Sequence, residues 1–510
     1  MKTNKIINWL SALLVAALVM TTSCNMDHDF LAGVTEDVVS DMLERDPELV
    51  MGFLAAAIGT LGDEWSNHDA AHIMSLQHAG DLMTEDMVMR RNDWHFFDYD
   101  IADGNNLANF RRPTHSWRMM YSVIGRVNQA IDLIDPETEN AVLQNVLGQS
   151  LALRAFSYHI LIQRFQHAYT VNREALGVPV VLSTRENAEG QPSRFYRVPV
   201  YQVYEQIVND LQRAVGLLGD ARTSTDFINR AVAQGFLARA FMNLERWAEA
   251  EEMAAAARAN FPLLSLEAAG TINYGVQAGN SEWMWGLNGT AENTRMFASF
   301  QSHMASDGNG YAGWGGNSSF KAMDNRLYHQ MGENDVRRKL HHMDEENDEF
   351  WNLKFRDVPN WLMDNIYMRA SEMLLIEAEA QARQGNNAQA ATTLMELMSR
   401  RDPDFNITSA TIEDVFLQKR LEMWGEGVIF YDNRRFERDI DRVYTEPRSN
   451  HLVQLHQSGR SWLVIYQIPR MEIDQNPYID DEDQNDANPA PGFNQSPRPI
   501  PGTLRVGREH

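Results

Sequence analysis

An alanine-rich helix pair occurs twice in this chain, and this internal repeat constrains the fold more than any other feature of the sequence. The first copy reads Leu-Ala-Arg-Ala at 237–240 and Trp-Ala-Glu-Ala at 247–250. The second reads Ile-Glu-Ala-Glu-Ala at 376–380 and, after a Gly-Asn-Asn turn, Ala-Gln-Ala at 388–390. Small alanine side chains let two helix backbones approach closely, and each polar turn reverses the chain. Both copies therefore predict helix-turn-helix units.

Helical periodicity extends this pattern towards the N-terminus. Apolar residues at 117, 121, 124, 127, 131 and 134 follow steps of three and four, and Asp135-Pro136 ends the stripe. A second stripe runs from Val203 to Leu218, and residues 142–169 read as a long helix between the two. Because the two repeat copies lie about 140 residues apart, they do not form a tandem array. The sequence predicts a mainly α fold, a tetratricopeptide-like solenoid of helix pairs with a large, irregular, loop-rich insertion.

The stretch at 265–360 differs in composition from the helices on either side of it. Helical periodicity is lost there, and glycines alternate with aromatic rings. These residues are Gly286, Gly289, Gly308, Gly310, Gly313, Gly315, Gly316, Trp283, Trp285, Tyr311 and Trp314. Irregular segments of this kind on a rigid scaffold commonly carry binding residues, so we expect ligand contacts in this insertion. The tail at 488–510 contains five prolines, which predicts irregular structure.

The N-terminus and the cysteine content predict an exported lipoprotein. Lys2 and Lys5 precede a mainly apolar run at 6–20, which has the length of a signal-peptide core rather than a membrane span. Small residues then lead into Cys24, the one cysteine of the chain. This arrangement resembles a bacterial lipoprotein signal, with residues 1–23 removed, Cys24 acylated and residues 24–34 forming the anchor and linker. A free cysteine behind an ordinary signal peptide is the alternative.

Charge and apolar content narrow the class of protein further. The formal net charge is -25 and no long basic run occurs, which argues against nucleic-acid binding because phosphate contacts need clustered Lys and Arg. Beyond Met26 the sequence contains no apolar stretch of 18 or more residues. The mature chain is therefore expected to be held at a membrane by its lipids rather than by a spanning helix.

The order of several short motifs resembles the SusD/RagB family across nearly the whole mature chain. The motifs are Trp117 with Tyr121, Ile124 and Asn128, then Leu153-Arg154-Ala155-Phe156, Asn209-Asp210-Leu211, Leu237-Ala238-Arg239-Ala240, Trp283-Met284-Trp285, Glu377-Ala378-Glu379-Ala380, Glu426-Gly427 with Asp432 and Arg435, Ile468-Pro469, Glu472-Ile473 and Asn476-Pro477. The resemblance implies a SusD-like helical region at 35–264, the insertion at 265–360 and a C-terminal SusD/RagB region at 361–510.

The resemblance implies a binding protein that faces the exterior of the outer membrane. Such a protein captures an oligosaccharide or other nutrient and delivers it to a SusC-like TonB-dependent transporter, without covalent chemistry and without a cofactor. Two other function classes stay open on the sequence. One is a lipid-anchored glycoside hydrolase, which would need two carboxylates about 5–10 Å apart in a cleft. The other is a repeat scaffold that binds only proteins.

Two polar-aromatic segments are the candidate glycan sites. Sugar rings bind to flat aromatic faces, and amides, carboxylates or guanidinium groups bind their hydroxyls. The first segment supplies Asn92, Trp94 and Phe96, and the second supplies Asn309, Tyr311 and Trp314. SusD-like starch binders draw an aromatic arc from corresponding regions. Rings that simply cap the core are the alternative interpretation.

Two further patterns imitate metal sites, and neither is interpreted as one. His68 and His72 are four residues apart with His78 nearby, but no H-E-x-x-H motif accompanies them, and a solvated helix face is the preferred interpretation. Asp481, Asp483 and Asn485 resemble the start of a calcium loop. Asp486 replaces the required glycine of that motif. We therefore expect an acidic surface loop there and no metal.

Overall fold

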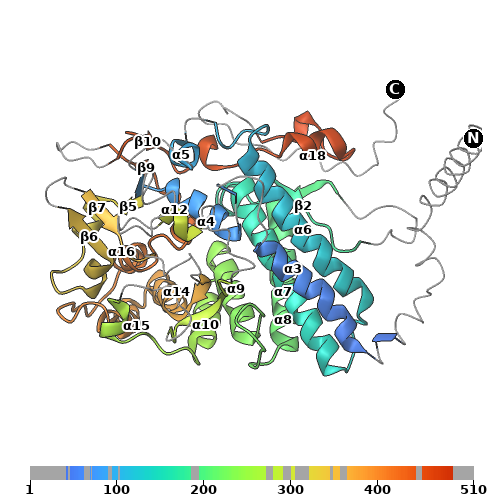
Figure 1. Ribbon diagram of the computed structural model, residues 1–510, viewed down its shortest axis with the longest axis horizontal. Helices are drawn as coiled ribbons and strands as arrows, with labels where there is room; N and C mark the ends of the chain where they lie inside the picture. The colour runs from blue at the N-terminus through green and yellow to red at the C-terminus, as the bar shows by residue number, and fades with distance from the viewer. Residues whose placement is uncertain are drawn as a thin grey trace, which may run out of the picture.

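Helices of the described chain pack on one another in sequence order (Figure 1). The computed structural model describes residues 42–43, 46–62, 69–70, 72–89, 95–101, 104–184, 195–271, 280–290, 300–304, 321–344, 349–355, 364–443 and 451–485. The stacked helices are α6 (Arg111–Leu133), α7 (Ala141–Phe165), α8 (Val200–Leu217), α9 (Arg230–Asn243), α10 (Trp247–Arg258), α14 (Ala370–Arg383) and α15 (Asn387–Met398). Because α10 packs directly against α14, the stack continues across the insertion. The predicted helical solenoid is confirmed.

Side chains and turns define the ends of these helices. Asn140 caps α7 by accepting from the backbone N–H of Val142 at 2.9 Å, and Asn229 caps α9 in the same way. The turn between α14 and α15 has Gly385 at φ 80°, a left-handed conformation that glycine adopts without steric cost. Glu245 takes the equivalent position between α9 and α10 at φ 56°. The two polar turns recognised in the sequence therefore have the same backbone geometry.

The described residues also form shorter helices outside this stack. They are α3 (Met51–Leu61), α4 (His72–Leu82), α5 (Phe96–Tyr99), α11 (Leu266–Ala269), α12 (Phe300–Met304), α13 (Asn325–Tyr328), α16 (Ile412–Glu422), α17 (Ile429–Arg435) and α18 (Arg470–Gln475), with short 3-10 turns η1 (Pro47–Val50), η5 (Val336–Leu340), η6 (Trp462–Val464) and η7 (Asp481–Asp483). None of the helices in the described ranges combines the length and apolar character that a membrane crossing requires.

Short antiparallel strand pairs join segments that are far apart in the sequence. The pairs are β1 (Met87–Met89) with β5 (Lys321–Met323), β2 (Leu176–Pro179) with β3 (Arg197–Pro199), β4 (Trp283–Leu287) with β8 (Asn365–Arg369), β6 (His341–Asp344) with β7 (Glu349–Asn352), and β9 (Ile440–Asp441) with β10 (His456–Gln457). Each strand is too short to show the alternation by which strands are recognised in a sequence. The sequence therefore predicted an irregular insertion where the structure also contains paired strands.

A buried network of charges ties the insertion to the helix stack. Arg369, at the end of β8, is fully buried and contacts Glu282 at 2.9 Å and Glu422 at 2.7 Å. Its Nε also contacts Glu426 at 2.7 Å. Arg401, which follows α15, contacts Glu282 at 2.8 Å and Glu422 at 2.9 Å. Burial alone would raise the pKa of Glu422, but Arg401 and Arg369 hold that pKa well below its usual range. The network is therefore charged and internally compensated.

We predict that Ala378→Leu destabilises the helix stack. Ala378 on α14 is completely buried, so extra methylene groups must displace neighbours at a close helix crossing, at a cost of about 1–3 kcal/mol in the free energy of unfolding. Ala238→Leu on α9, equally buried, is expected to behave alike. Denaturant unfolding measures both, and Ala388→Leu at an exposed position of α15 is the control. Equal midpoints for all variants and the wild type would contradict the role of these alanines.

Candidate functional site

The structure places one of the predicted glycan-contacting side chains. Phe96 is half-buried at the start of α5 and its ring lies 5.9 Å from that of Tyr99. The other predicted site residues, Asn92, Trp94, Asn309, Tyr311 and Trp314, lie outside the described residues, as does Cys24.

Described residues that flank the two aromatic segments lie beside each other in the fold. Met89 at the end of β1 pairs with Lys321 at the start of β5, so a described residue before the first segment lies beside a described residue after the second. At the other ends, the rings of His95 and His303 lie 4.7 Å apart in an edge-to-face contact. Trp94 immediately precedes His95 in the sequence. Residues more than 200 positions apart are thus brought together, which only the tertiary structure reveals.

A cluster of buried histidines forms this junction. His78 on α4 lies 4.7 Å from the His95 ring, again edge to face, and the side chains of His78, His95 and His303 are almost completely buried. Burial, and then nearby His303 and Arg112, lower the pKa of His95 well below its ordinary value. Burial also lowers the pKa of His78 well below its ordinary value, and the charge of His95 acts in the same direction. The two imidazoles are therefore neutral at physiological pH.

His95 is held in an uncommon backbone conformation by its charged neighbours. Its φ is 70°, in the left-handed region that residues other than glycine seldom adopt. Its Nδ1 lies 3.1 Å from Asp98, and Arg112 donates to both oxygens of that carboxylate at 3.0 and 2.7 Å. Strained residues persist where the surroundings over-determine them, often at binding sites. Sequence reasoning passed over His95 because nothing local distinguishes it.

One interpretation of polar residues from the sequence is wrong, whereas the acidic loop lies at the surface as expected. His72 and His78 were assigned to a solvated helix face, but both are buried because α4 is enclosed by α3, α12 and α17. His68 lies outside the described residues. The acidic loop is exposed at Asp481, yet Asn485 is only 1% exposed. Across the described part of the chain, no group of His, Cys, Asp and Glu side chains is arranged to hold a metal ion.

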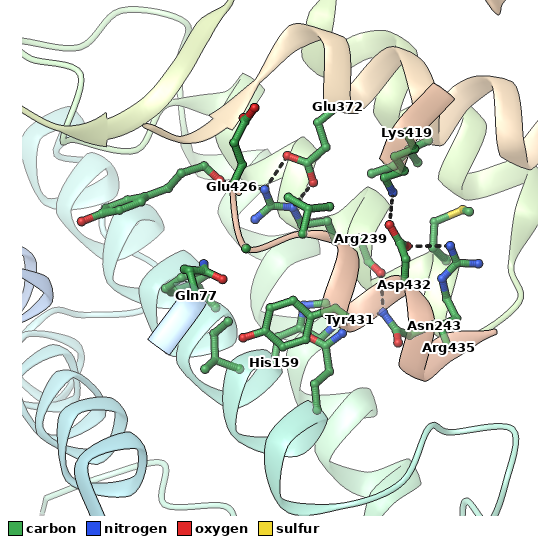
Figure 2. Close-up of a pocket in the computed structure, with 18 residues that line it drawn as sticks. Gln77, His159, Arg239, Asn243, Glu372, Lys419, Glu426, Tyr431, Asp432 and Arg435 are labelled. Carbon is green, nitrogen blue, oxygen red and sulfur yellow. Dashed lines mark hydrogen bonds and ion pairs between the residues drawn. The ribbon is translucent and has the colours of Figure 1, made fainter. Parts of the chain in front are cut away.

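A small cavity, lined by both polar and apolar side chains, lies between the helix stack and α17 (Figure 2). Its volume is about 60 Å³, enough for a few water molecules and far below the roughly 300–1,000 Å³ of ligand pockets. Its charges are paired: Arg239 contacts Glu372 at 2.6 Å, and Asp432 contacts Lys419 at 2.6 Å and Arg435 at 2.7 Å. These residues come from several of the family-like motifs. We interpret the cavity as part of the folded core.

The Glu426-Gly427 turn beside this cavity is fixed by Asp81 of α4. The backbone N–H of Gly427 donates to Asp81 Oδ2 at 2.7 Å, and Gly427 has φ 75°. A Cβ at position 427 would overlap the side chain of Gln77, so the turn requires glycine. Asp81 Oδ1 has no hydrogen-bond partner among the described residues. Burial raises the pKa of Asp81 to about 8.

A larger hollow, here named the α6–α18 groove, lies between α6, the chain after β2 and α18. Its volume is about 700 Å³, within the range of ligand pockets. Trp117 and Tyr121, with ring centroids 4.7 Å apart, line it together with Phe195 and Glu472. The sequence placed Trp117 and Tyr121 on an apolar helix stripe. The structure adds that both residues line an open groove, with Trp117 buried and Tyr121 half-buried.

We predict that, as pH rises, the free energy of unfolding of the wild type falls relative to that of the Asp81→Asn variant. The pKa of Asp81 is about 8 in the fold against 3.8 ordinarily, so between these values the folded chain binds a proton that the unfolded chain has released. This contribution is complete below pH 3.8 and is lost as pH rises through 8. The expected difference is about 1.4 kcal/mol per pH unit.

Denaturant unfolding at pH 5, 6 and 7 measures this difference. In the Asp81→Asn variant the side-chain amide oxygen can still accept from the backbone N–H of Gly427, so the turn is preserved. Asp220→Asn, at a side chain that is 70% exposed, controls for the loss of a carboxylate. Parallel pH profiles for the wild type and Asp81→Asn would contradict a raised pKa.

Comparison with known proteins identifies relatives for both parts of the chain. Residues 53–242 match a SusD-like family described as "Starch-binding associating with outer membrane", and residues 360–498 match the SusD family. SusD-like protein P2 of Formosa agariphila is 30% identical over 144 residues, which are 27% of this chain and 25% of that protein. The match to that relative therefore spans a quarter of its length.

Solved structures share the fold over most of the chain. A SusD-like carbohydrate binding protein from Bacteroides vulgatus is 24% identical, with 85% of this chain and 97% of that chain covered at a TM-score of 0.72. A SusD superfamily protein from Bacteroides thetaiotaomicron is 22% identical, with 86% and 99% covered at 0.70. Surface glycan-binding protein A from Bacteroides uniformis is 20% identical, with 85% and 98% covered at 0.65. From the family matches and this common fold, we conclude that the chain belongs to the SusD/RagB family.

Proposed function

We propose that this protein binds an oligosaccharide at the outer surface of a bacterial outer membrane and delivers it to a SusC-like TonB-dependent transporter. Membership of the SusD/RagB family supports the proposal. So do the names of structural relatives, one a SusD-like carbohydrate binding protein and another a surface glycan-binding protein. The observation that carries it is the junction of β1 with β5 and of His95 with His303, which brings together described residues that flank the two aromatic segments.

The junction suits an aromatic binding site for physical reasons. A sugar is held by ring faces whose positions are fixed before it arrives, because ordering them on binding costs free energy. The residues beside both segments are buried, and Arg112 and Asp98 form an ion pair of 2.7 Å beneath them. Neutral imidazoles pack there without like-charge repulsion. We propose that Trp94, Tyr311 and Trp314 supply the ring faces above this base.

Polar side chains complete the proposed site. Asn92 and Asn309 belong to the same two segments, and their amides can donate to and accept from sugar hydroxyls. Phe96 is described at the edge of the junction and is half-buried. We therefore propose that Phe96 supports the site from α5 while the two amides orient the ligand.

Anchoring through Cys24 is the second part of the proposal. The described helices provide no membrane-crossing segment, and two acyl chains are generally needed for stable attachment to a bilayer. We propose that acylation of Cys24 supplies them and positions the protein beside its transporter.

Cys24→Ala is expected to release the protein from the outer membrane, because the thiol that accepts the lipid is lost. Fractionation of cells that lack the partner transporter measures the change. Ser23→Ala, which retains the thiol, is the matched control and should stay membrane-bound. Retention of Cys24→Ala in the membrane fraction would contradict lipid anchoring.

Trp94→Ala or Trp314→Ala is expected to weaken oligosaccharide binding by about 1–3 kcal/mol, the scale for loss of an aromatic anchor. Calorimetric titration should begin with a panel that includes malto-oligosaccharides, since one matching family is described as starch-binding. Both variants should keep the thermal midpoint of the wild type. Trp247→Ala, at a half-buried ring of α10, is the control and should leave affinity unchanged.

Two results would contradict the assignment. Unchanged affinity in a well-folded Trp94→Ala, Trp314→Ala double variant would exclude these rings as the site. A large loss of stability, about 3–5 kcal/mol, would instead indicate that they cap the core. Chromatography of the same incubations tests catalysis, because released sugar products would identify a glycoside hydrolase rather than a binding protein.

A further inference from the structure

The α6–α18 groove is an open, mainly apolar surface. Figure 1 shows α6 and α18 on the side of the fold remote from α15. Tyr121 and Phe195 line it and are half-buried, while Ser122 on its rim is exposed. Gly125 contributes an open position on α6, because a Cβ there would meet nothing within 4 Å. A glycine inside a helix costs about 1 kcal/mol relative to alanine. The bare helix surface at Gly125 therefore leaves room for another chain to approach.

The polar groups of the groove floor are already satisfied by one another. The indole N–H of Trp117 donates to Glu472 at 3.1 Å. The Tyr121 hydroxyl donates to the carbonyl of Pro179 at 2.7 Å. The remaining ring, that of Phe195, offers a flat face rather than a hydrogen bond. Such a surface suits a ligand that has few backbone donors of its own.

The described chain ends close to this groove. Asn485 is buried and donates to the carbonyls of Phe165 at 2.6 Å and Tyr466 at 2.8 Å. Its Oδ1 accepts from Arg197 at 2.8 Å, and Arg197 donates to the carbonyl of Gly177 at 2.7 Å. Gly177 belongs to β2, whose last residue lines the groove. Residues 486–510 lie outside the described residues and follow directly from this fixed point.

We propose that residues 488–501 of this chain dock in the α6–α18 groove as an extended, proline-rich strap. The segment reads Asn-Pro-Ala-Pro-Gly-Phe-Asn-Gln-Ser-Pro-Arg-Pro-Ile-Pro. Prolines lack a backbone N–H and favour the polyproline II conformation, which docks on aromatic-lined grooves at a low cost in entropy. The groove provides such rings and needs no backbone donors.

Reach and the low charge of the segment agree with this occupant. Asn485 is linked through Arg197 to Gly177, and the backbone from Gly177 to the groove residue Val181 spans at most about 13 Å, at roughly 3.3 Å per residue. Residues 486–490 cover a similar distance when extended. Arg498 is the one charged residue in 488–501, and the Glu472 carboxylate lines the groove. Arg118 also lines it, with its side chain exposed to solvent.

Disulfide trapping in the full chain tests the proposal. In a Cys24→Ala background, Ser122→Cys on the groove rim is combined with Ser496→Cys in the strap. Ser122 is exposed, so the fold should tolerate the change. The matched control combines Ser496→Cys with Ala388→Cys, at an exposed position of α15. We expect an intramolecular disulfide to form at least tenfold faster in the groove pair than in the control pair, independent of protein concentration.

A second variant tests occupancy of the groove itself. Gly125→Leu places a side chain in open space on α6 and should slow trapping of the Ser122→Cys, Ser496→Cys pair at least tenfold without lowering the thermal midpoint. Equal trapping rates for the groove and control pairs would overturn the proposal. So would a disulfide that forms only between molecules, since the groove would then receive a second copy. Insensitivity to Gly125→Leu would place the strap elsewhere.

Discussion

The buried ion pairs of Arg369 are the interaction on which the rest of the structure depends. Its guanidinium lies fully buried among Glu282, Glu422 and Glu426, at 2.7 to 2.9 Å from each. Removing a charge from water costs several kcal/mol, and only close, well-oriented partners recover that cost. Removal of one member would leave carboxylates buried without compensation. The network therefore requires all of its contributing segments to be in place at once.

Those segments come from every part of the C-terminal half of the fold. Glu282 precedes β4, Arg369 ends β8 and Glu422 ends α16. Lys354 lies two residues after β7, and its Nζ is 2.5 Å from the Glu426 carboxylate. The insertion is thus not a loose appendage of the helix stack. Glu282 and Lys354, which lie towards its two ends, form ion pairs with residues that follow the insertion in the sequence.

The same principle applies at the junction of the aromatic segments. Asp98 and Arg112 form a buried pair beneath His95, and the histidines around them stay neutral because burial disfavours their charged form. Neutral rings can stack closely where charged ones would repel. In this base the one ion pair is internally compensated and the imidazoles are neutral, which is compatible with a sugar ligand that carries hydroxyl groups and apolar ring faces rather than net charge.

The sequence by itself determined the helix stack, because the signals for it are local. Apolar spacing, asparagine caps such as Asn140 and the polar turn at Gly385 act within a few residues of one another, and the structure follows them closely. The alanine-rich repeat also indicated that two distant helix pairs belong to one solenoid, and the packing of α10 on α14 confirms it.

Only the tertiary structure decided which distant polar residues meet. His78 and His72 resemble residues of a solvated face, since the enclosure of α4 by other helices leaves no local trace in the sequence. The pairing of Met89 with Lys321, the fixing of Gly427 by Asp81 and the opening of a groove beside Trp117 likewise arise between segments far apart in the chain. Helical periodicity records the contacts of each helix with its core, whereas a binding surface depends on non-local contacts that no short pattern encodes.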